Sequence, residues 1–434
     1  MHARSKSAVF ISNPKSHPAA VMKKAYRFRI YPNPAQVKVL ERTLETCRIL
    51  YNELLAERRD TYKTTGRSPS RYAQQQSLVA RKLNSLYLRE VHSQVLQDVT
   101  FRLQRAFDNF FRRLREAKKK AGYPRFKGWN RYDSFKYPQY GNGVMLKDGR
   151  LVLSKIGTVR IFQHRPIPLN MTIKTCAIRR DVDKWYACFT TETTDVPKTQ
   201  RQQETRVGVD LGLYSLVTLS NGEKVPPPKF LRKMEKKLKQ EQRQLSRKKK
   251  RSKNWCKQKT KVARVHRKVR LQRTDFNHKL SRTLINQYSM IAFEKLQIQN
   301  MVKNHSLAKS IMDAAWGQLQ AFTSYKAAGA GTIVEFVDPY GTTVNCSRCG
   351  FHVPKTLSER IHKCPNCGLV LDRDWNSALN VHIRVGWGTA EFTPVETKPL
   401  LQPRMDGASM VRNQEAHDLY SRSKFRERSN DLVV

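Results

Sequence analysis

Apolar residues recur at two spacings near the N-terminus, and each spacing predicts a different element. Apolar and polar positions alternate over 24–32, as in a β-strand, and Pro32-Asn33-Pro34 ends the pattern. Asn33 can cap a helix over 35–59, in which apolar side chains return every three or four positions. The resulting helical face comprises Val37, Leu40, Leu44, Cys47, Tyr51 and Leu54. We interpret it as an ordinary core face.

Residues 60–72 are rich in Thr, Ser and Arg and predict a gap, after which helical spacing resumes over 73–118 and stops before Gly122 and Pro124. The chain beyond has the β-branched and aromatic content of strands. The clearest strand segments are 158–162, 172–182 and 184–193. A mainly helical segment therefore lies between a first strand and a later group of strands, which predicts a helical insertion in a small β domain.

A second series of elements begins at Arg206. Residues 206–212 and 214–220 have the pattern of strands, and Asn221-Gly222 is typical of the turn of a β-hairpin. The later elements are a strand at 289–294, a helix at about 312–328, a strand at 332–338 and a helix at about 374–385. Together the two series predict a multidomain α+β protein.

Charge changes this picture more than any other property of the composition. The 434 residues contain 83 Lys and Arg against 35 Asp and Glu, a formal net charge of +48. Such a surplus repels itself unless a polyanion neutralises it, and the release of counterions from phosphates is its usual use. Residues 225–273 carry 21 of these bases and two acids, which favours a phosphate partner over a merely solvated helix. We therefore expect nucleic acid as the partner.

Two features argue against a membrane partner. No apolar run reaches the roughly 18 residues of a membrane span, and the basic segments lack the Trp, Phe and Leu face of an interfacial helix. The apolar run at 8–11 is too short for the core of a signal peptide. We expect a cytoplasmic, nucleoid-associated protein of a prokaryotic cell.

Residues 1–21 have the character of a loose extension, and 386–434 lack periodicity and are expected to be disordered.

Four of the eight cysteines form two closely spaced pairs, Cys346 with Cys349 and Cys364 with Cys367. In each pair two residues separate the thiols and a glycine follows, so both sulfurs can reach one ion from a tight turn. Two such turns supply a closed tetrahedral site, which is the structural arrangement for Zn²⁺. Disulfides are the alternative, and a reducing compartment argues against them. Four thiolates saturate the ion, so we expect no histidine ligand.

Three carboxylates lie where predicted elements end or begin. Asp210 lies on the strand VGVDLG between Gly208 and Gly212, and an acid on an apolar strand is costly unless a cation meets it. The two glycines leave room for a bulky ligand to approach. Glu294 ends a later strand, and Asp374 opens the last helix. Taken singly, Asp210 could be salt-bridged, and each of the others could be a surface acid or a helix cap.

Together, the three acids predict a two-metal site. A hairpin-led sheet with acids on its first strand, on a later strand and on the closing helix is the ribonuclease-H-like arrangement. Three carboxylates can hold two divalent ions about 4 Å apart, of which one activates water and the other stabilises the leaving oxygen of a phosphodiester. Mg²⁺ suits oxygen ligands of this kind. Asp338 is the rival candidate, but the Pro339 that follows it indicates a structural turn.

With these motifs, the chain resembles a known family. It is similar to the TnpB family of transposon-encoded, RNA-guided DNA nucleases, which are related to the type V CRISPR effectors. The resemblance runs from about Phe28 to Val381, and its segments follow the family's order. They are FRIYPNPAQ (28–36), EVHSQVLQDVTFRLQRAFDNFF (90–111), YPRFKGWNRYDSFKYP (123–138), VGVDLG (207–212), IAFEKL (291–296), CSRCG (346–350) and CPNCGLVLDRDWNSALNV (364–381).

The resemblance implies a small β wedge domain with a helical recognition domain inserted in it, followed by a RuvC (ribonuclease-H-like) α/β nuclease domain with an inserted zinc ribbon. The implied boundaries are an N-terminal extension at 1–21, the wedge domain at 22–45 and 123–205, the recognition domain at 46–122, the RuvC domain at 206–341 and 372–385, the zinc ribbon at 342–371, and a tail at 386–434.

The resemblance also implies Asp210, Glu294 and Asp374 as the catalytic acids that bind Mg²⁺, since Asp374 rather than Asp372 matches the family's third acid. A guide RNA made from the transposon end would direct the nuclease to double-stranded DNA beside a short recognised motif. The chain departs from the family where Y-T-S-Q usually precedes the ribbon, because it reads Gly341-Thr342-Thr343-Val344 there. Inactive relatives lose acids of the triad, and this chain keeps all three, which favours cleavage.

Side chains that could contact nucleic acid lie in two segments of the resemblance. On the predicted helix, amide and guanidinium groups could read base edges in the major groove, although an ordinary solvated face is the alternative. These residues are Gln94, Gln97, Arg102 and Arg105. Further along, Arg125 and Lys127 alternate with aromatic residues, which suits backbone and stacking contacts.

Two other functions stay open on the sequence alone. A guided DNA-binding regulator would use the charge and the zinc site but would not cleave. A DNA transposase would use the same acids for strand transfer, although the resemblance argues against it.

Overall fold

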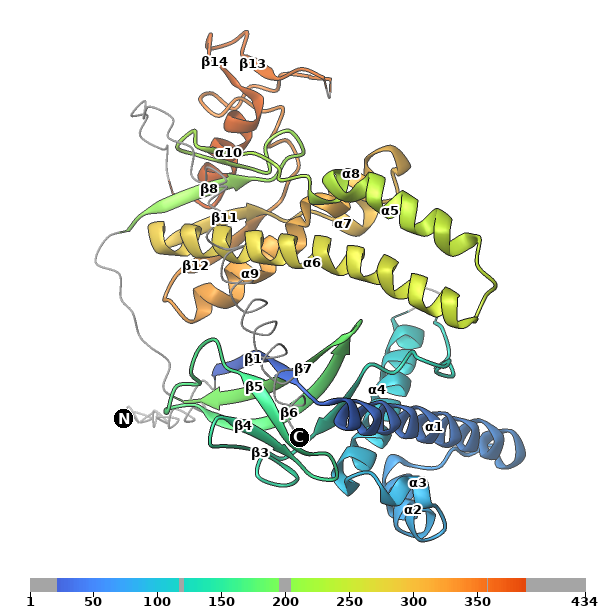
Figure 1. Ribbon diagram of the computed structural model, residues 1–434. Coiled ribbons are helices and arrows are strands. Elements are labelled where there is room, and N and C mark those ends of the chain that lie inside the picture. Colours follow the sequence, from blue (N-terminus) through green and yellow to red (C-terminus); the bar gives the residue numbers. More distant parts are fainter. Residues whose placement is uncertain (1–21, 117–120, 195–203, 357, 388–434) are drawn as a thin grey trace, which may run out of the picture. The chain divides into compact units, whose positions relative to one another are not determined.

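The described part of the computed structural model comprises residues 22–116, 121–194, 204–356 and 358–387. These residues form an α+β protein with two compact units (Figure 1). The first unit comprises Met1–Pro197 and Gln244–Arg264, and the second comprises Lys198–Arg243 and Val265–Val434. The predicted loose extension at 1–21, and all but the first two residues of the predicted tail at 386–434, lie outside the described residues.

The first unit is built on one antiparallel sheet in the strand order β2-β6-β7-β1-β5-β4-β3. Its strands are β1 (Met22–Tyr31), β2 (Ser134–Tyr137), β3 (Val144–Lys147), β4 (Arg150–Leu153), β5 (Gly157–Phe162), β6 (Thr172–Asp181) and β7 (Lys184–Thr193). Alternation along β1 sends Tyr26, Phe28 and Ile30 into the core. The sequence predicted β1, β5, β6 and β7 but not β2, β3 and β4, because four residues are too few to display a period.

Four helices lie between β1 and β2 in the chain, as the predicted helical insertion requires. They are α1 (Pro34–Thr65), α2 (Arg71–Leu83), α3 (Leu86–Arg89) and α4 (Ser93–Arg115). Asn33 and Gln36 form a reciprocal capping box at the start of α1, and Gly66 ends it at φ +68°. The predicted gap at 60–72 is therefore shorter, and the single helical stretch at 73–118 is three helices. The predicted core face of α1 is confirmed, since all its members but the half-buried Val37 are buried.

The second unit is built on a mixed sheet in the order β10-β9-β8-β11-β12. Its strands are β8 (Arg206–Asp210), β9 (Val217–Leu219), β10 (Lys224–Val225), β11 (Met290–Glu294) and β12 (Ile333–Val337). Strand β8 pairs antiparallel with β9, and β9 pairs antiparallel with β10 across the predicted turn at Asn221-Gly222, whereas β8, β11 and β12 run parallel. Parallel strands end at the same edge of a sheet, so the last residues of β8 and β11 lie on one side.

Helices α7 (Ile298–Met301), α8 (His305–Ala314), α9 (Trp316–Ala328) and α10 (Arg373–Arg384) complete this unit. The helix predicted at 312–328 is divided between α8 and α9, because Ala315 adopts a left-handed backbone conformation with φ +54°. Helix α10 packs mainly against β8, the strand that carries Asp210.

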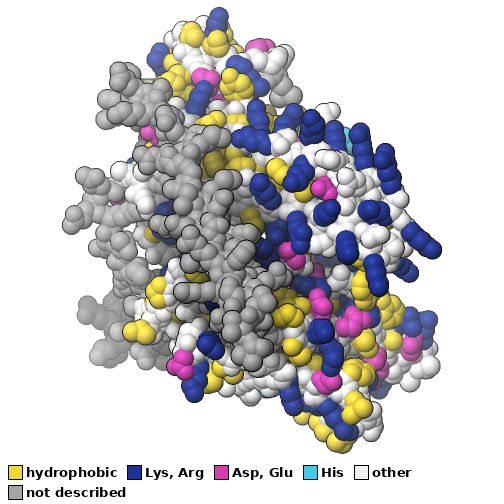
Figure 2. Space-filling view, viewed as in Figure 1, with side chains coloured by type: hydrophobic (Ala, Val, Ile, Leu, Met, Phe, Trp, Pro, Cys, Tyr) yellow, Lys and Arg dark blue, Asp and Glu magenta, His cyan; other side chains and the backbone are white. Residues whose placement is uncertain are grey.

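The basic stretch forms two helices, α5 (Phe230–Ser246) and α6 (Lys253–Gln287). Helix α5 is described in full, and none of its residues is buried. Figure 2 shows Lys and Arg side chains gathered over these helices, with few Asp or Glu among them. The stretch therefore carries its charge on the surface. Among the described residues, no helix combines the length and the apolar character needed to cross a bilayer.

Candidate metal and nucleic-acid sites

The four paired cysteines come together on two tight turns beside a ribbon of β13 (Ile361–Lys363) and β14 (Val370–Asp372). A glycine follows each pair in a left-handed conformation, with φ +74° at Gly350 and +69° at Gly368. The amide of each glycine donates to the carbonyl of the first cysteine of its pair, at 2.9 Å and 3.1 Å. The glycines thus turn the backbone under the sulfurs, as their positions indicated.

The sulfur positions suit a single ion. All four Sγ atoms lie within 4.8 Å of one another, with 3.6 Å between Cys346 and Cys367 and 3.5 Å between Cys349 and Cys364. A tetrahedral Zn²⁺ with Zn–S bonds of about 2.3 Å holds its sulfurs about 3.8 Å apart, whereas a disulfide bond is about 2.05 Å long. All eight cysteines are free thiols. The four cysteines could therefore hold zinc, and the disulfide alternative is wrong.

The surroundings of Cys349 favour its thiolate, whereas, against a hydrogen bond from the Leu369 backbone, burial and the neighbouring cysteines raise the pKa of Cys367 to about 12. A hydrogen bond from the Asn366 side chain, helped by the backbone at Phe351, lowers the pKa of Cys349 to about 6. The thiolate, which is the form that binds metal, is thus accessible at neutral pH. The two nearby histidines lie outside the sulfur group: His352 Nδ1 contacts Asn345 Oδ1 at 3.0 Å, and His362 Nδ1 contacts Lys355 Nζ.

The three acids singled out in the sequence are brought together in the second unit. Asp210 is the last residue of β8, Glu294 is the last residue of its parallel neighbour β11, and Asp374 is the second residue of α10. They are 8%, 5% and 7% exposed, respectively. A Cβ on Gly208 would lie 2.3 Å from the Ala378 carbonyl oxygen, so the backbone of α10 fills the space beside this glycine. The expectation that Gly208 leaves room for a ligand is therefore wrong; it leaves room for the helix that carries Asp374.

Shared neighbours connect the three carboxylates. The Ser377 hydroxyl lies 3.3 Å from Glu294 Oε1 and also hydrogen-bonds Asp210. A Cβ on Gly212 would lie 3.8 Å from Oδ2 of Asp210 and 3.8 Å from Oδ2 of Asp374. Unlike Gly208, Gly212 therefore borders the carboxylates themselves.

The electrostatics of this cluster are unfavourable for carboxylates alone. Burial raises the pKa of Asp210 well above its ordinary value, and the nearby charges of Glu294 and Asp374 raise it further. Burial also raises the pKa of Glu294, against the opposing hydrogen bond that Thr342 donates at 2.6 Å. Arg373 pairs with Asp374 at 3.1 Å, whereas neither Asp210 nor Glu294 has an ion pair within the described residues. Buried acids so placed would be stabilised by a bound dication.

The other two acids considered have structural contacts. Asp372 caps α10, because its Oδ1 accepts from the backbone amides of Asp374 and Trp375 at 3.0 Å and 3.1 Å, and its Oδ2 pairs with Lys224 at 2.8 Å. Asp338 is exposed, and its side chain accepts from the amide of Tyr340 at 2.9 Å, which is the turn that Pro339 indicated.

The residues expected to contact nucleic acid lie in the first unit but differ in accessibility. Gln94 and Gln97 are half-buried on α4, and the Gln94 amide donates to Gln139 at 2.6 Å. Arg125 and Lys127 are exposed on the segment before β2. Arg102 pairs with a buried partner, since its Nε lies 2.6 Å from Asp98, and a contact of Arg102 with base edges stays a prediction.

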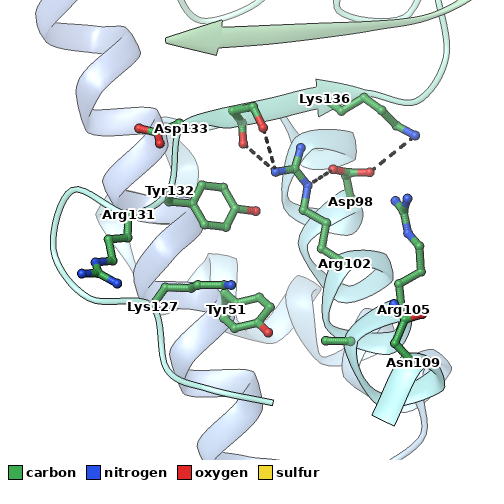
Figure 3. Close-up of a pocket in the computed structure, with 12 residues that line it drawn as sticks. Tyr51, Asp98, Arg102, Arg105, Asn109, Lys127, Arg131, Tyr132, Asp133 and Lys136 are labelled. Carbon is green, nitrogen blue, oxygen red and sulfur yellow. Dashed lines mark hydrogen bonds and ion pairs between the residues drawn. The ribbon is translucent and has the colours of Figure 1, made fainter. Parts of the chain in front are cut away.

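A cavity of about 580 Å³ opens between α1, α4 and the segment before β2 (Figure 3). Five basic and two acidic side chains line it. Both acids are paired, Asp98 with Arg102 and with Lys136, and Asp133 with Arg180. The lining residues are Tyr51, Asp98, Arg102, Arg105, Ala106, Asn109, Lys127, Arg131, Tyr132, Asp133, Ser134 and Lys136. The cavity is therefore positively charged, with Arg105, Lys127 and Arg131 outside any ion pair among the described residues.

Two features of this basic cavity show a fixed architecture. The Asn52 side chain holds both the amide and the carbonyl of Lys127, at 2.7 Å and 3.0 Å, and Arg48 donates to the same carbonyl at 2.9 Å. Tyr132 is 6% exposed, its ring points into the cavity in Figure 3, and the Arg102 guanidinium lies beside its hydroxyl. Burial raises the pKa of Tyr132, so the hydroxyl stays protonated and can donate.

The sequence singled out the acids, the cysteines and Lys127 as candidates but not Tyr132, Thr342 or Ser377. Tyr132 lies in a segment without periodicity, so nothing marked its burial. Ser377 and Thr342 approach Glu294 only when the chain is folded, because both are distant from it in the sequence. The only signal in the sequence was that each lies within or next to a family motif.

Three family models match the chain. One described as a probable transposase matches residues 188–305, one described as a Cas12f1-like TNB domain matches residues 316–381, and one described as a helix-turn-helix domain matches residues 22–67. The last of these covers β1 and α1, so in this chain the matched segment is a strand followed by one long helix. The second covers the cysteine cluster and Asp374.

Several relatives match most of the chain, and two of them show the extent of the similarity. A protein of Streptomyces pristinaespiralis named "Putative RNA-guided DNA endonuclease" is 35% identical over 368 residues, which cover 83% of this chain and 89% of that protein. An Escherichia coli K12 protein of the same description, InsQ, is 32% identical over 379 residues, which cover 82% and 91%. Among solved structures, a Cas12f1–guide RNA–target DNA complex matches with a TM-score of 0.52 and 11% identity, over 83% of this chain and 99% of that one. This last likeness concerns the fold.

Proposed function

The chain belongs to the TnpB family, and we propose that it is an RNA-guided, Mg²⁺-dependent DNA endonuclease whose catalytic acids are Asp210, Glu294 and Asp374. One observation carries the proposal: three buried carboxylates from β8, β11 and α10 converge at one sheet edge without enough cations to balance them. The names of the relatives supply the substrate class, and the net charge of +48 suits it.

We propose that the second unit is a RuvC nuclease domain of the ribonuclease-H type. Its sheet order, in which the first three strands form an antiparallel meander and β11 and β12 add in parallel, supports this reading. The three carboxylates would hold divalent ions, which supply an activated water and charge stabilisation at the scissile phosphodiester. Ser377 and Thr342 would orient these carboxylates, and Arg373 would hold Asp374. The proposed domain extends over 206–341 and 372–385, with the zinc ribbon at 342–371; of these residues, Gln244–Arg264 belong to the first compact unit.

We propose that the first unit is a wedge domain, at 22–45 and 123–205, with the recognition domain at 46–122 inserted. Helix α1 runs unbroken through the boundary at 45–46, so the two domains would share a rigid element. Within this unit the basic cavity would take a phosphodiester of the bound nucleic acid, with Lys127 and Arg131 as cations and the Tyr132 hydroxyl as a neutral donor. Gln94, Gln97 and Arg125 remain proposed contacts of the same partner.

Cleavage by the purified protein tests the function. The protein is co-expressed with its RNA, the RNA is sequenced to define the guide, and matched duplex DNA is offered with Mg²⁺. The parent should cut, and Asp210→Ala should lower the rate by about 10³-fold or more, because a metal-binding charge is lost. Asp275→Ala, which removes an exposed carboxylate of the same unit, is the matched control. Equal cutting by Asp210→Ala and the parent would contradict the assignment, and repression of a target without cutting in any divalent ion would favour a regulator.

A further inference from the structure

A ten-residue stretch connects β12 to the cysteine site and contacts both Glu294 and the helix that carries Asp374. This linking loop, residues 338–347, begins after β12 and ends inside the first cysteine turn. Gly341 adopts φ +74°, and a Cβ there would lie 3.1 Å from Asn345 Nδ2 and 3.3 Å from Arg384 Nη2. Gly341 therefore lets the loop turn tightly against α10.

The linking loop contacts Glu294 directly. The Thr342 hydroxyl lies 2.6 Å from Glu294 Oε1, and Thr342 is 1% exposed. The same hydroxyl lies 3.0 Å from the Pro339 carbonyl, so its proton has one alternative acceptor within the loop. Because the contact is buried, a shift of the loop would move or release the carboxylate of Glu294.

Two asparagines of α10 fasten the linking loop to the helix that carries Asp374. Asn376 accepts from the Ser347 amide at 3.0 Å and donates to the Asn345 carbonyl at 2.8 Å. Asn380, one turn later, donates to the carbonyls of Thr342 and Asn345 at 2.8 Å and 2.7 Å. Both asparagines are buried, so water cannot replace these contacts without reorganisation.

The hydrogen bonds between α10 and the linking loop extend into the first cysteine turn. Ser347 lies between Cys346 and Cys349, and its amide is the donor to Asn376. Within this turn the Cys346 amide donates to the Phe351 carbonyl at 2.9 Å, which closes the backbone around the sulfurs. An ion that holds Cys346 and Cys349 thus fixes the backbone to which α10 is bonded.

We propose that the linking loop, together with Asn376 and Asn380, couples the cysteine site to the carboxylate site. A metal on the cysteines holds Glu294 and Asp374 in their binding geometry, and a divalent ion on the acids in turn strengthens metal binding by the cysteines. Thr342, Asn376 and Asn380 are positioning residues. The coupling rests on the proposed function, because it requires the acids to bind divalent ions.

Thermodynamic linkage makes the coupling measurable in both directions. If zinc on the cysteines raises the affinity of the acids for Mn²⁺ by a factor, Mn²⁺ must raise the affinity for zinc by the same factor. The full-length protein is prepared with zinc and after chelation. Mn²⁺ binding is followed by electron paramagnetic resonance, and zinc affinity by competition with a chromophoric chelator. We expect a factor of about tenfold in each direction, in the range usual for coupled sites.

Variants separate coupling from folding. Asn376→Ala and Thr342→Val should reduce the factor toward one while each still binds zinc, and Thr342→Ser should restore it because the hydroxyl returns. Asn300→Ala, at an exposed asparagine of the same unit, is the control and should retain the parent's factor. If the parent binds Mn²⁺ but zinc does not change the Mn²⁺ affinity, the coupling is overturned while the proposed function stands. The same holds if both variants keep the parent's factor. Mn²⁺ binding that Asp210→Ala leaves unchanged would overturn the proposed function and the coupling with it.

Discussion

The carboxylate cluster of the second unit gathers negative charge, whereas the basic cavity of the first unit gathers positive charge. The two sites differ in how that charge is balanced. The cluster buries three acids, and the one direct ion pair among the described residues goes to Asp374. The basic cavity has five cations, but it also contains two paired acids. Without a bound cation, repulsion between the three carboxylates destabilises the cluster. In the basic cavity, the two acids already balance part of the positive charge.

The difference reflects the ligand that each site is proposed to hold. A divalent ion is small and strongly bound, so its ligands can be buried and strained by mutual repulsion, and binding repays the cost. A nucleic-acid phosphate keeps part of its hydration and is held by charge over a longer range. Its site therefore needs cations in fixed places, such as Lys127 with its backbone held by Asn52, but no buried excess of charge.

The largest effect should come from removing the repulsion in the carboxylate cluster. Asp210→Asn should abolish cleavage and, without metal, should raise the Tm by roughly 2–4 °C per kcal/mol of relieved repulsion. The folded protein raises the pKa of Asp210 and Glu294 above their ordinary values near 4. Their stability contribution is thus present at low pH and is lost as pH rises through the raised pKa values. Thermal unfolding in a chelator, at pH 5 and pH 8, measures the difference.

The gain in Tm from Asp210→Asn should be larger at pH 8 than at pH 5 and should vanish when Mg²⁺ is added, since the parent then gains the stability of binding. Asp275→Asn, which removes an exposed carboxylate paired with Lys279, should change neither curve. An Asp210→Asn protein that is less stable than the parent in chelator would mean that the cluster is balanced by contacts other than metal.

The two regions also differ in how far the sequence could predict them. Asp210, Glu294 and the cysteines sit at strand ends or fixed spacings, which periodicity and motif geometry reveal. The basic cavity draws Tyr51 from α1, Asp98 from α4 and Tyr132 from an irregular segment. Nothing local connects these residues, because their proximity arises from packing between elements distant in the chain. The error about Gly208 has the same origin, since a strand pattern does not reveal which neighbour fills the space beside a glycine.

A moderate effect is expected from the paired acid of the basic cavity. Asp98 is 3% exposed and accepts from Arg102 at 2.6 Å, while Lys136 lies 3.7 Å away. Asp98→Asn should lower the free energy of unfolding of the first unit by about 1.5–3 kcal/mol, the range for hydrogen bonds to charged groups. Denaturant unfolding measures it, with Asp60→Asn at an exposed pair as the control that should show little change. If Asp98→Asn leaves the free energy of unfolding unchanged, the cavity does not depend on this ion pair. The two sites would then differ less in how they balance their charge.

The smallest effect concerns a single cation of the basic cavity. Lys127→Gln should weaken DNA binding by roughly tenfold at 0.1 M salt, uniformly across sequences, and should reduce the slope of log K against log salt by about 0.9, because one phosphate contact is lost. Lys147→Gln removes the same charge from an exposed site of the same unit and should leave the slope nearly unchanged. Tyr132→Phe should weaken binding without changing the slope, since its hydroxyl carries no charge. Equal slopes for Lys127→Gln and Lys147→Gln would mean that the cavity contributes only to the general positive field, and that its fixed backbone serves the fold rather than a phosphate.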